Sequence, residues 1–538
     1  MSAGVSAQAV AMWLARKRSR SSGWERTCRA LRRRRTPNGD EEPKVTTADF
    51  LNGTVAESCA ARYCYLAVQS HGRPTANDIE IKVASLCSGS EMVAVVASAI
   101  GKALAVQGVP VRFQFMLLCE VVAAKREWGS NVVDCLFPDN DACHFDNVTT
   151  LGAGRGYCTK HLDNCCIPEC DLLVSGFSCK DFSSQASHVP LSQSAFAQGG
   201  STTGGSSQTF WGTLGVIDEA NPDIVFLENV EQLENTPNQA IVDVIHVELA
   251  KRSFDVQAWI ADTMEYALPH HRRRLFMMCV RRPGRVFQIA NHDAFFKSVF
   301  NLLDMFKAEP CDLTECLLDS SHEVVQREFS VREARGKGKQ FDQNTIKLHR
   351  AEFQKAGVRW GSISALKEDL ASPWFPLLPQ SMQATLAFHH RSAKSSRELP
   401  QYLQGVDLSQ SINRRIHTTT TRTGKLVTPT ILPRSCLWMS IEQGKSVHRP
   451  LLGIESMMLQ GFPIMAQDFR NIFEKLGRGD AFLQDLAGNA FSSSVVCALI
   501  TATLFSAELT PGTSSRVTLQ GAAAEEALAL FTNSAAVP

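Results

Sequence analysis

The sequence predicts an α/β fold built on a mainly parallel sheet, and two observations support this prediction. Short apolar segments alternate with helix-like segments between residues 79 and 280. Small or acidic residues directly follow several apolar segments, at the sheet edge where α/β proteins place their sites. With 538 residues, 44% of them hydrophobic and 20% charged, the chain has the composition of a globular protein of two or three domains.

The expected elements follow in chain order. The predicted strands are Ile81–Cys87, Val111–Cys119, Asp171–Ser175, Asp223–Leu227, Phe254–Ala261 and Leu275–Val280. Helices are expected over Glu91–Val106 and from Glu120 through Val133. Periodicity weakens between Pro283 and Val447. A helix-like segment starts at Arg449, a turn follows at Gly461–Pro463, and Phe491–Phe505 is the last predicted helix.

Charge and cysteine content narrow the class of protein. The net charge is only +1, so contact with nucleic acid would depend on a local basic surface. The 17 cysteines form no repeating framework, which indicates reduced thiols in an intracellular protein. The sequence contains no uninterrupted apolar run of membrane-spanning length, so no membrane association is expected.

A basic segment, Met1–Lys44, precedes the expected domain. Its cations are Arg16, Lys17, Arg18, Arg20 and Arg32 to Arg35. Such a cluster suits nuclear import or phosphate binding, and we favour a nuclear protein. An organellar transit peptide and a solvated tail without an address are the alternatives.

One cysteine is placed where a nucleophile could act. Cys179 follows the predicted strand Asp171–Ser175 directly, and Lys180 is a neighbouring cation that could favour the thiolate. Considered alone, a buried inert cysteine is the commoner explanation. Glu228 ends another strand, where it could donate a proton to a base nitrogen or simply be solvated. Arg272 and Arg274 alternate into a strand and suit a base edge or phosphates, although a solvated basic turn is the alternative.

In this order the segments resemble the cytosine-5 DNA methyltransferase family. The family loop Gly-x-Pro-Cys-Gln-x-Phe-Ser is matched at Gly176, Cys179, Phe182 and Ser183, whereas Ser178 replaces proline and Lys180 replaces glutamine. Glu228, Asn229 and Val230 match Glu-Asn-Val. His270, Arg272 and Arg274 match Gln-x-Arg-x-Arg, with histidine for glutamine. Arg449 to Glu455 with Leu459 to Pro463 resemble the ninth family motif, and Gly488 to Phe491 the tenth.

The resemblance implies a site for S-adenosylmethionine. The family's first motif, a Phe-x-Gly-x-Gly turn, corresponds to Leu86, Ser88, Gly89, Ser90 and Glu91, with one glycine left. Glu120 ends the second strand, where an acid can hold ribose hydroxyls. Asp146 resembles the acid that contacts adenine. Asn489 and Ala490 of the tenth motif complete the expected cofactor residues.

The resemblance also implies a domain plan. Residues 79–283 and 447–505 would form a Rossmann-like, S-adenosylmethionine-dependent methyltransferase domain, and residues 284–446 an inserted target-recognition region. Residues 1–78 would be a basic, unstructured segment and residues 506–538 a tail. In the target region, phosphate contacts are expected from Arg414, Arg415, Arg422 and Lys425, with a solvated loop as the alternative.

The implied reaction is methylation of carbon 5 of a flipped cytosine in DNA. The Cys179 thiolate would add to carbon 6, and Glu228 would hydrogen-bond or protonate ring nitrogen 3. By resemblance, Arg272 would hold the flipped base and Arg274 would brace the loop. RNA, in particular transfer RNA, is an alternative substrate, because a small family member acting on transfer RNA shares these motifs. An inactive nucleic-acid-binding homologue is the other alternative.

A second group of cysteines lies just before the nucleophile strand. It consists of Cys158, His161, Cys165, Cys166 and Cys170. These residue types can bind zinc, but no Cys-x-x-Cys pair is present. The spacing therefore predicts an inserted loop with free thiols and no metal.

Overall fold

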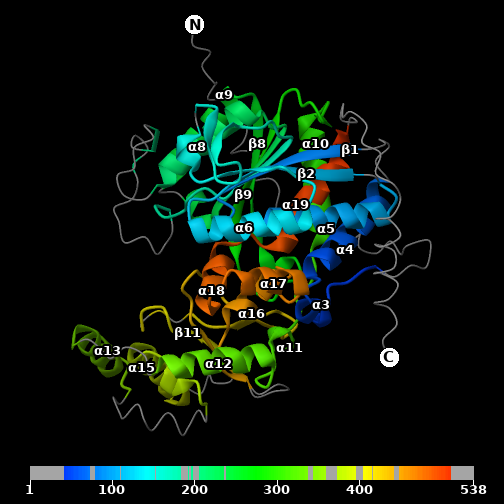
Figure 1. The fold of residues 1–538 in the computed structure, drawn as a ribbon. Coiled ribbons are helices and arrows are strands. Elements are labelled where there is room, and N and C mark those ends of the chain that lie inside the picture. Colours follow the sequence, from blue (N-terminus) through cyan, green and yellow to red (C-terminus); the bar gives the residue numbers. More distant parts are fainter. Residues whose placement is uncertain are drawn as a thin grey trace.

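Figure 1 shows the computed structural model of the chain. It describes residues 42–72, 79–182, 205–336, 343–358, 372–395, 404–441 and 447–509, together with Ser192, Phe196 and Ala197, except for Pro110, Gly152, Thr236, Pro237, Asn413 and Arg415. The basic residues of Met1–Lys44 named above lie outside this part of the chain.

The core is one nine-stranded sheet with the order β5-β4-β3-β2-β1-β6-β7-β9-β8. Pairing is parallel from β3 to β7, and antiparallel at both ends. The prediction of a mainly parallel α/β sheet is therefore confirmed. The strands are β1 (Ile79–Leu86), β2 (Val111–Cys119), β3 (Cys143–Phe145), β4 (Arg155–Cys158), β5 (Asp163–Cys166), β6 (Leu172–Ser175), β7 (Ile224–Val230), β8 (Phe254–Asp262) and β9 (Arg273–Arg281).

Alternate strand residues feed two separate cores, as the pleat requires. Leu172 and Val174 of β6 pack into the core that contains α5 (Met92–Val106) and α6 (Ala123–Leu136), whereas Leu173 packs into the core that contains α8 (Ser206–Ala220) and α9 (Gln239–Lys251). The helices therefore cover both faces (Figure 1). This layering leaves the carboxyl ends of the parallel strands at one edge, where β6 and β7 deliver Cys179 and Glu228.

The prediction that residues 1–78 are unstructured is wrong for their second half. Two helices, α3 (Thr47–Asn52) and α4 (Val55–His71), form there. Helix α4 packs against α5 and against the last helix, α19 (Ser493–Ser506), and its Tyr63 is buried. The apolar residues of α4 are spread around the helix, because it is covered on several sides, so it lacks the stripe that marks a surface helix.

The predicted boundary at residue 283 is also too early. Strand β10 (Phe287–Gln288) pairs with β16 (Glu508–Leu509), and α10 (His292–Phe306) packs against α19 and α4. Both elements belong to the sheet-bearing part of the molecule. The tail prediction is corrected at the same place, since Glu508 and Leu509 form a strand.

The remaining elements form a lower lobe in Figure 1. Its segment before residue 447 contains α11 (Leu313–Cys316), α12 (Glu323–Arg335), α13 (Gln343–Lys355), α15 (Gln380–Ser395), β11 (Gly405–Asp407), β12 (Thr419–Thr420), β13 (Leu426–Val427) and β14 (Leu437–Ile441). After it come β15 (Val447–Pro450), α16 (Gly453–Leu459), α17 (Gln467–Lys475) and α18 (Asp480–Asn489). The helix expected from Arg449 thus begins at Gly453, because Arg449 pairs with Met439 in a small sheet.

The last helix that the structure describes lies against helices that cover the main sheet. Helix α19 packs against α5, and nearly all of its side chains are buried. The stretch Asp480–Ser506 is long and apolar enough to cross a membrane, but 94% of its most apolar window is buried inside the protein. The stretch comprises α18 and α19, and its apolar side chains belong to the core of the protein.

Candidate active site

The loop that carries Cys179 is held from two sides. Asn229 donates its side-chain amide to the carbonyl of Phe177 at 3.0 Å, and the Ser178 amide donates to Oγ1 of Thr209 at 3.0 Å. Thr209 is itself anchored through its hydroxyl to the carbonyl of Gly205. The loop without the family proline is therefore fixed by hydrogen bonds from β7 and from the start of α8. Neither Asn229 nor Thr209 was identified as a positioning residue from the sequence.

Glu228 and Arg274 face the same side of the sheet. β7 and β9 run antiparallel with Glu228 opposite Phe276, which makes Arg274 its diagonal neighbour. Nε of Arg274 lies 3.1 Å from Oε1 of Glu228, and both side chains are about 15% exposed. Arg274 is thus the arginine that reaches the acid, while a second bond to the carbonyl of Arg273 fixes its guanidinium.

Arg272 occupies a different place from the one predicted. Its guanidinium is buried and donates to the carbonyls of Ile431, Gly488 and Ala490 at 3.3, 3.3 and 2.9 Å. These bonds join the arginine motif to the end of α18 and to the lower lobe. The predicted roles, Arg272 holding the base and Arg274 bracing the loop, stay predictions, and the positions of the two side chains favour the reverse assignment.

Burial and charge act in opposite directions on the Cys179 thiol. Burial is the main cause that raises the pKa of Cys179, and the negative charge of Glu228 raises it further, while Arg274 and Arg272 lower it. The charges of Glu228, Arg274 and Arg272 all change the pKa of Cys179, so the four predicted catalytic residues interact electrostatically. Lys180 is exposed, so the cations that favour the thiolate are the two arginines. Ser183, also part of the matched loop, lies outside the described residues.

His270, which replaces the family glutamine, is part of a buried hydrogen-bond chain. Its Nε2 lies 3.1 Å from Oε1 of Gln460, and Gln460 donates to the carbonyl of Ala487. Burial is the main cause that lowers the pKa of His270, and Arg272 adds to it, so the ring is neutral. Gln460 belongs to the Leu459–Pro463 motif, so this hydrogen bond connects the segment that matches Gln-x-Arg-x-Arg to the ninth motif.

The turn after β1, the end of β2 and the tenth family motif lie close together at the carboxyl edge of the parallel strands. Gly89 has a φ of +62°, and a Cβ on it would lie 3.0 Å from the carbonyl oxygen of Asn489. Its amide donates to Glu120 at 3.1 Å, and the other Glu120 oxygen accepts from the Val122 amide. Only glycine suits this left-handed, crowded position. Glu120 thus fixes the turn as well as ending β2.

Asp146 follows β3 on the same edge, beside Glu120. The Glu120 amide donates to the carbonyl of Phe145, and Asp146 is partly exposed. Two carboxylates at neighbouring strand ends form an acceptor set that suits ribose hydroxyls and an exocyclic amino group. By the chemistry of these acceptors, the residues present fit S-adenosylmethionine.

The side chains of several predicted cofactor residues are buried and do not face a ligand. Leu86, Ser88, Ser90, Glu91 and Ala490 are all buried. Burial raises the pKa of Glu91 to about 7, and Glu91 adopts a φ of +59° at the start of α5. These residues shape the turn through their backbone, and Glu91 replaces the second family glycine in the left-handed conformation that glycine would adopt.

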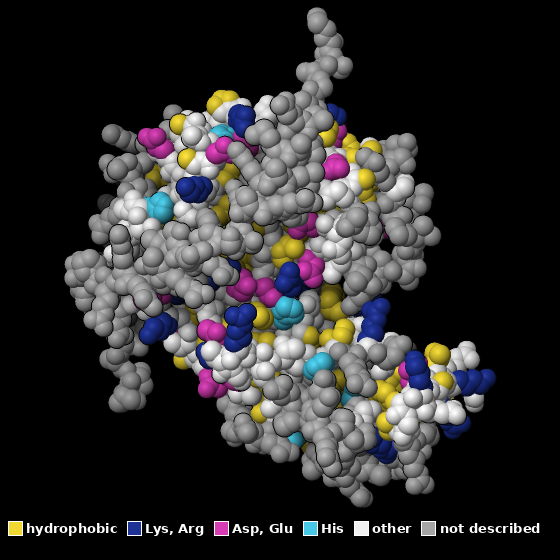
Figure 2. Space-filling model, turned by 180° about the vertical axis from the view of Figure 1, so that it is seen from behind, with side chains coloured by type: hydrophobic (Ala, Val, Ile, Leu, Met, Phe, Trp, Pro, Cys, Tyr) yellow, Lys and Arg dark blue, Asp and Glu magenta, His cyan; other side chains and the backbone are white. Residues whose placement is uncertain are grey.

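Only some of the residues that were predicted to contact phosphates in the target region are exposed. Arg414 and Arg422 are exposed, whereas Lys425 donates to the carbonyl of Pro310 at 2.8 Å; Arg415 lies outside the described residues. The larger basic surface is on α13, where Lys347, Arg350 and Lys355 are exposed. Figure 2 shows Lys and Arg side chains on this part of the lower lobe.

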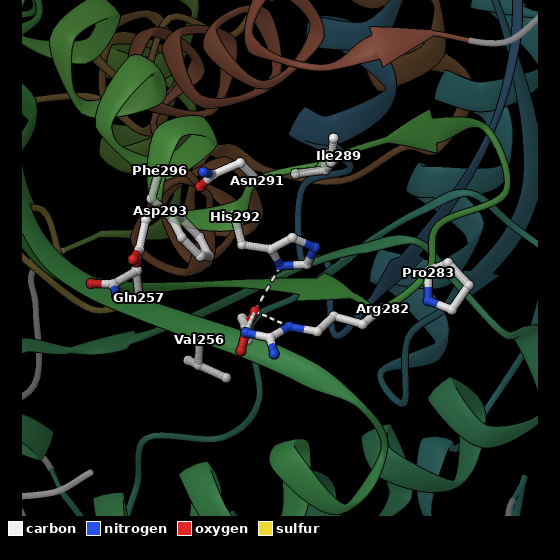
Figure 3. Close-up of a pocket in the computed structure, with 11 residues that line it drawn as sticks. Val256, Gln257, Arg282, Pro283, Ile289, Asn291, His292, Asp293 and Phe296 are labelled. Carbon is white, nitrogen blue, oxygen red and sulfur yellow. Dashed lines mark hydrogen bonds and ion pairs between the residues drawn. The ribbon is translucent and has the colours of Figure 1, made fainter.

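A cavity lies away from this site. It has a volume of about 640 Å³ and is lined by the starts of β8 and α10 and by the loop after β9. His292 and Arg282 both point to Asp255 there (Figure 3). β9 runs from Arg274 at the catalytic edge to Arg281 at this end, so the cavity is at the opposite edge of the sheet.

Comparisons with known proteins identify the family. A family model for C-5 cytosine-specific DNA methylases matches residues 155–504, more than half of the chain. DNA (cytosine-5-)-methyltransferase DMT5 of Cryptococcus neoformans is 24% identical over 456 residues, which cover 80% of this chain but only 17% of that protein. Type II methyltransferase M.HhaI of Haemophilus parahaemolyticus is 26% identical over 115 residues, 21% of this chain and 32% of the enzyme.

Among solved structures, the Schizosaccharomyces pombe Dnmt2 methyltransferase shares 14% identity and a TM-score of 0.37, over 79% of this chain and 98% of its own. That similarity is too low to bear on function. The family matched by residues 155–504 is S-adenosylmethionine-dependent. The ordered motifs, the sheet that brings them to one edge and the extent of the family match agree. This chain belongs to the C-5 cytosine-specific DNA methylase family.

Proposed function

We propose that the chain is a DNA (cytosine-5-)-methyltransferase that acts on a flipped cytosine through a covalent bond to Cys179. The observation that supports it most is the meeting of Cys179, Glu228 and Arg274 where the carboxyl ends of β6 and β7 lie beside the amino end of β9. Carbon 5 of cytosine is a poor nucleophile, and a thiolate that adds to carbon 6 makes it carbanion-like. A nucleophile beside an acid is the arrangement that this addition needs.

Each residue has a defined task in the proposed reaction. The Cys179 sulfur forms a bond to carbon 6, and the electrons of the 5,6 double bond move to carbon 5. Glu228 donates a hydrogen bond or a proton to ring nitrogen 3, which stabilises the charge that develops on the ring. Arg274 orients the Glu228 carboxyl and is the cation nearest to the base. A base must leave the duplex to reach this buried edge.

S-adenosylmethionine supplies an electrophilic methyl group on a sulfonium, which carbon 5 accepts. Glu120 and Asp146 would hold its ribose and adenine, and the backbone of the Gly89 turn would face its amino-acid end. Transfer of the carbon-5 proton to solvent then restores the 5,6 double bond, the Cys179 sulfur leaves carbon 6, and any proton on ring nitrogen 3 returns to Glu228. The thiol must lose its proton before addition, a step that Arg274 and Arg272 favour electrostatically.

DNA is the proposed substrate, with RNA as the alternative to be tested. DMT5 and M.HhaI are named as DNA and type II methyltransferases, and the basic surface of α13 offers contacts to a phosphate backbone. Nuclear localisation remains a proposal that depends on the arginines before residue 36. Fusion of residues 1–44 to a fluorescent protein tests it.

A mechanism-based trap tests the reaction. A substrate with 5-fluorocytosine keeps its fluorine where a proton would leave, so methyl transfer should leave Cys179 bonded to the nucleic acid. We expect an adduct that survives denaturant, requires S-adenosylmethionine, forms on DNA, and is lost in Cys179→Ala. Cys135→Ala changes an exposed cysteine on α6 and should still be trapped.

The outcomes separate the alternatives. An adduct on RNA but not on DNA would replace the proposed substrate. Absence of an adduct on both, with donor binding measured intact by calorimetry, would make the chain an inactive nucleic-acid-binding member of the family.

A further inference from the structure

A cluster of metal-ligating side chains lies at the edge of the sheet beyond the cofactor site. It consists of Cys143, Cys158, His161 and Cys165, whose ligand atoms all lie within 4.8 Å of one another. The last three were candidate ligands by residue type, whereas Cys143, which lies 15 residues before Cys158, was not identified from the sequence. Cys166 and Cys170, the other two candidates, are not part of this group.

Strand pairing explains how these residues meet. β4 and β5 form a hairpin in which Gly156 is opposite Cys165, and β4 pairs with β3 through Phe145 and Cys158. The expected inserted loop is therefore an ordered hairpin on the edge of the main sheet. The turn of the hairpin carries His161, and the following residue, Leu162, has a φ of +55°. Spacing along the chain could not reveal a site assembled across three strands.

The distances match tetrahedral coordination. Nδ1 of His161 lies 3.7, 3.4 and 3.3 Å from the sulfurs of Cys143, Cys158 and Cys165. A zinc ion with bonds of about 2.3 Å to sulfur and about 2.0–2.1 Å to nitrogen gives ligand atoms about 3.5 Å apart. One ring nitrogen thus faces three sulfurs at the separation that a shared ion would impose.

The surroundings of the ligands are also those of a metal centre. Nε2 of His161 lies 2.9 Å from Oδ1 of Asp141, which orients the ring so that Nδ1 faces the sulfurs. A carboxylate behind a histidine ligand has this function in zinc sites. The sulfur of Cys158 accepts from the amides of His144 and His161 at 3.2 and 3.5 Å, bonds that stabilise a thiolate.

We propose that these four residues form a structural zinc site. Three thiolates and one imidazole make a complete tetrahedral set with no position left for substrate, which is typical of structural and not catalytic zinc. The ion would fasten the β4–β5 hairpin to β3. Since Asp146 directly follows β3, the site would stabilise the strand end that carries a proposed cofactor residue.

Metal analysis of the purified full-length chain tests the proposal directly. We expect one zinc per chain by mass spectrometry, and a strong visible absorption of tetrahedral cobalt–thiolate after exchange with cobalt. Cys143→Ser and Cys165→Ser should each lose the zinc. Cys166→Ser is the matched control, because Cys166 is exposed on the same hairpin and should retain one zinc per chain. These readouts do not depend on methyl transfer, so they stand if the proposed reaction fails.

The histidine contact gives a finer test. Asp141 is on the surface, so Asp141→Asn should fold normally and weaken zinc binding about 10- to 100-fold in competition with a chelator. Wild-type protein that contains no zinc and takes up neither zinc nor cobalt would overturn the proposal. Iron in place of zinc, or equal zinc in Cys143→Ser and wild type, would also overturn it. If the serine variants fail to fold, the metal content and cobalt spectrum of wild type decide the outcome.

Discussion

Nε of Arg274 lies 3.1 Å from Oε1 of Glu228, and both groups act on the thiol of Cys179 with opposite sign. Glu228 raises the pKa of Cys179 and Arg274 lowers it. The acid of the proposed reaction thus makes the proposed nucleophile less reactive in the free protein, and the arginine offsets part of that effect. Because the two charges have opposite effects, a substitution of Glu228 should change the reactivity of the thiol and the rate of methyl transfer in opposite directions.

Glu228→Gln should increase alkylation of Cys179 and decrease methyl transfer. Removing the carboxylate lowers the pKa of Cys179, so more thiolate is present at a fixed pH near neutrality and iodoacetamide reacts faster. Methyl transfer should fall about 10²- to 10⁴-fold with loss of the proton donor. Alkylation is read at the Cys179 peptide by mass spectrometry. Glu231→Gln, which loses only an ion pair with Arg273, is the control. Slower alkylation in Glu228→Gln would contradict the assigned electrostatics.

The pH dependence of wild type follows from the same shift. Because burial raises the pKa of Cys179 above the ordinary thiol value, the thiolate fraction should continue to increase with pH through the range where an exposed cysteine has already levelled off. N-acetylcysteine in the same buffer provides the comparison with an ordinary exposed thiol. A plateau for Cys179 at lower pH than for that free thiol would show that the arginines outweigh burial.

Lysine substitution should distinguish the two arginines. Arg274→Lys keeps the charge but loses the guanidinium geometry at Glu228, so turnover should fall about 10- to 100-fold, the equivalent of one charge-assisted hydrogen bond, with little change in stability. Arg272→Lys should instead lower the free energy of unfolding by about 1–3 kcal/mol for each buried carbonyl left unsatisfied. Denaturant titration and steady-state kinetics on both variants test this contrast. Equal stability losses would refute the distinction.

Thr209→Val should slow methyl transfer without affecting the donor site. The variant removes the acceptor of the Ser178 amide and loosens the loop before Cys179. Loss of one neutral hydrogen bond, about 0.5–1.5 kcal/mol, corresponds to a decrease of about 2- to 10-fold in rate. Affinity for S-adenosylmethionine should stay at the wild-type value. Thr503→Val, whose hydroxyl bonds only within α19, is the matched control.

Glu120→Ala should weaken binding of S-adenosylmethionine by about 1.5–3 kcal/mol for each hydrogen bond lost. The structure adds a second reason, because Glu120 also accepts from the amides of Gly89 and Val122. Calorimetry measures the affinity, and thermal denaturation establishes that the variant is folded. Glu127→Ala changes an exposed acid on α6 as a control. Unchanged affinity in folded Glu120→Ala would remove this residue from the cofactor site.

Removal of residues 1–44 should leave turnover on short substrates near normal. The loss includes the ion pair between Glu42 and Arg62, but no helix or strand described in the structure. Binding to long nucleic acid at low salt should weaken with the loss of the basic segment. Removal of residues 1–71 should instead abolish folding, because α4 covers apolar surface of α5 and α19. A folded, active protein without α4 would contradict this role.

The elements that the sequence predicted well are those with a local signal. Parallel strands buried on both faces are continuous apolar runs, so β1, β2, β6 and β7 could be found, and with them the strand ends that carry Cys179, Glu228 and Glu120. Helix α4 gave no such signal because its apolar residues point to several neighbours. The cluster around His161 gave none because Cys143 joins it through strand pairing.

Residue roles were harder to predict than residue positions. The alternate positions of Arg272 and Arg274 in the sequence predicted that both side chains point to one face of a strand. They did not predict which of the two side chains would be buried. That depends on the return of the chain at Gly488, where a Cβ would lie 2.0 Å from the backbone nitrogen of Pro433. The carbonyls that cover Arg272 belong to residues 159 to 218 positions later in the chain, and no local pattern predicts these contacts.

The packing of α4 against α19 has a consequence for biosynthesis. Residues near the start of the chain share a core with residues that the ribosome adds more than 400 positions later. During translation, the apolar surface of α4 and α5 stays uncovered until α19 has been synthesised. In that period it can bind chaperones or aggregate. The helices that cover the half of the sheet next to the proposed cofactor site are all in place only when α19 has left the ribosome. The nascent chain should therefore gain binding of S-adenosylmethionine in one step after synthesis of Phe505, and not gradually.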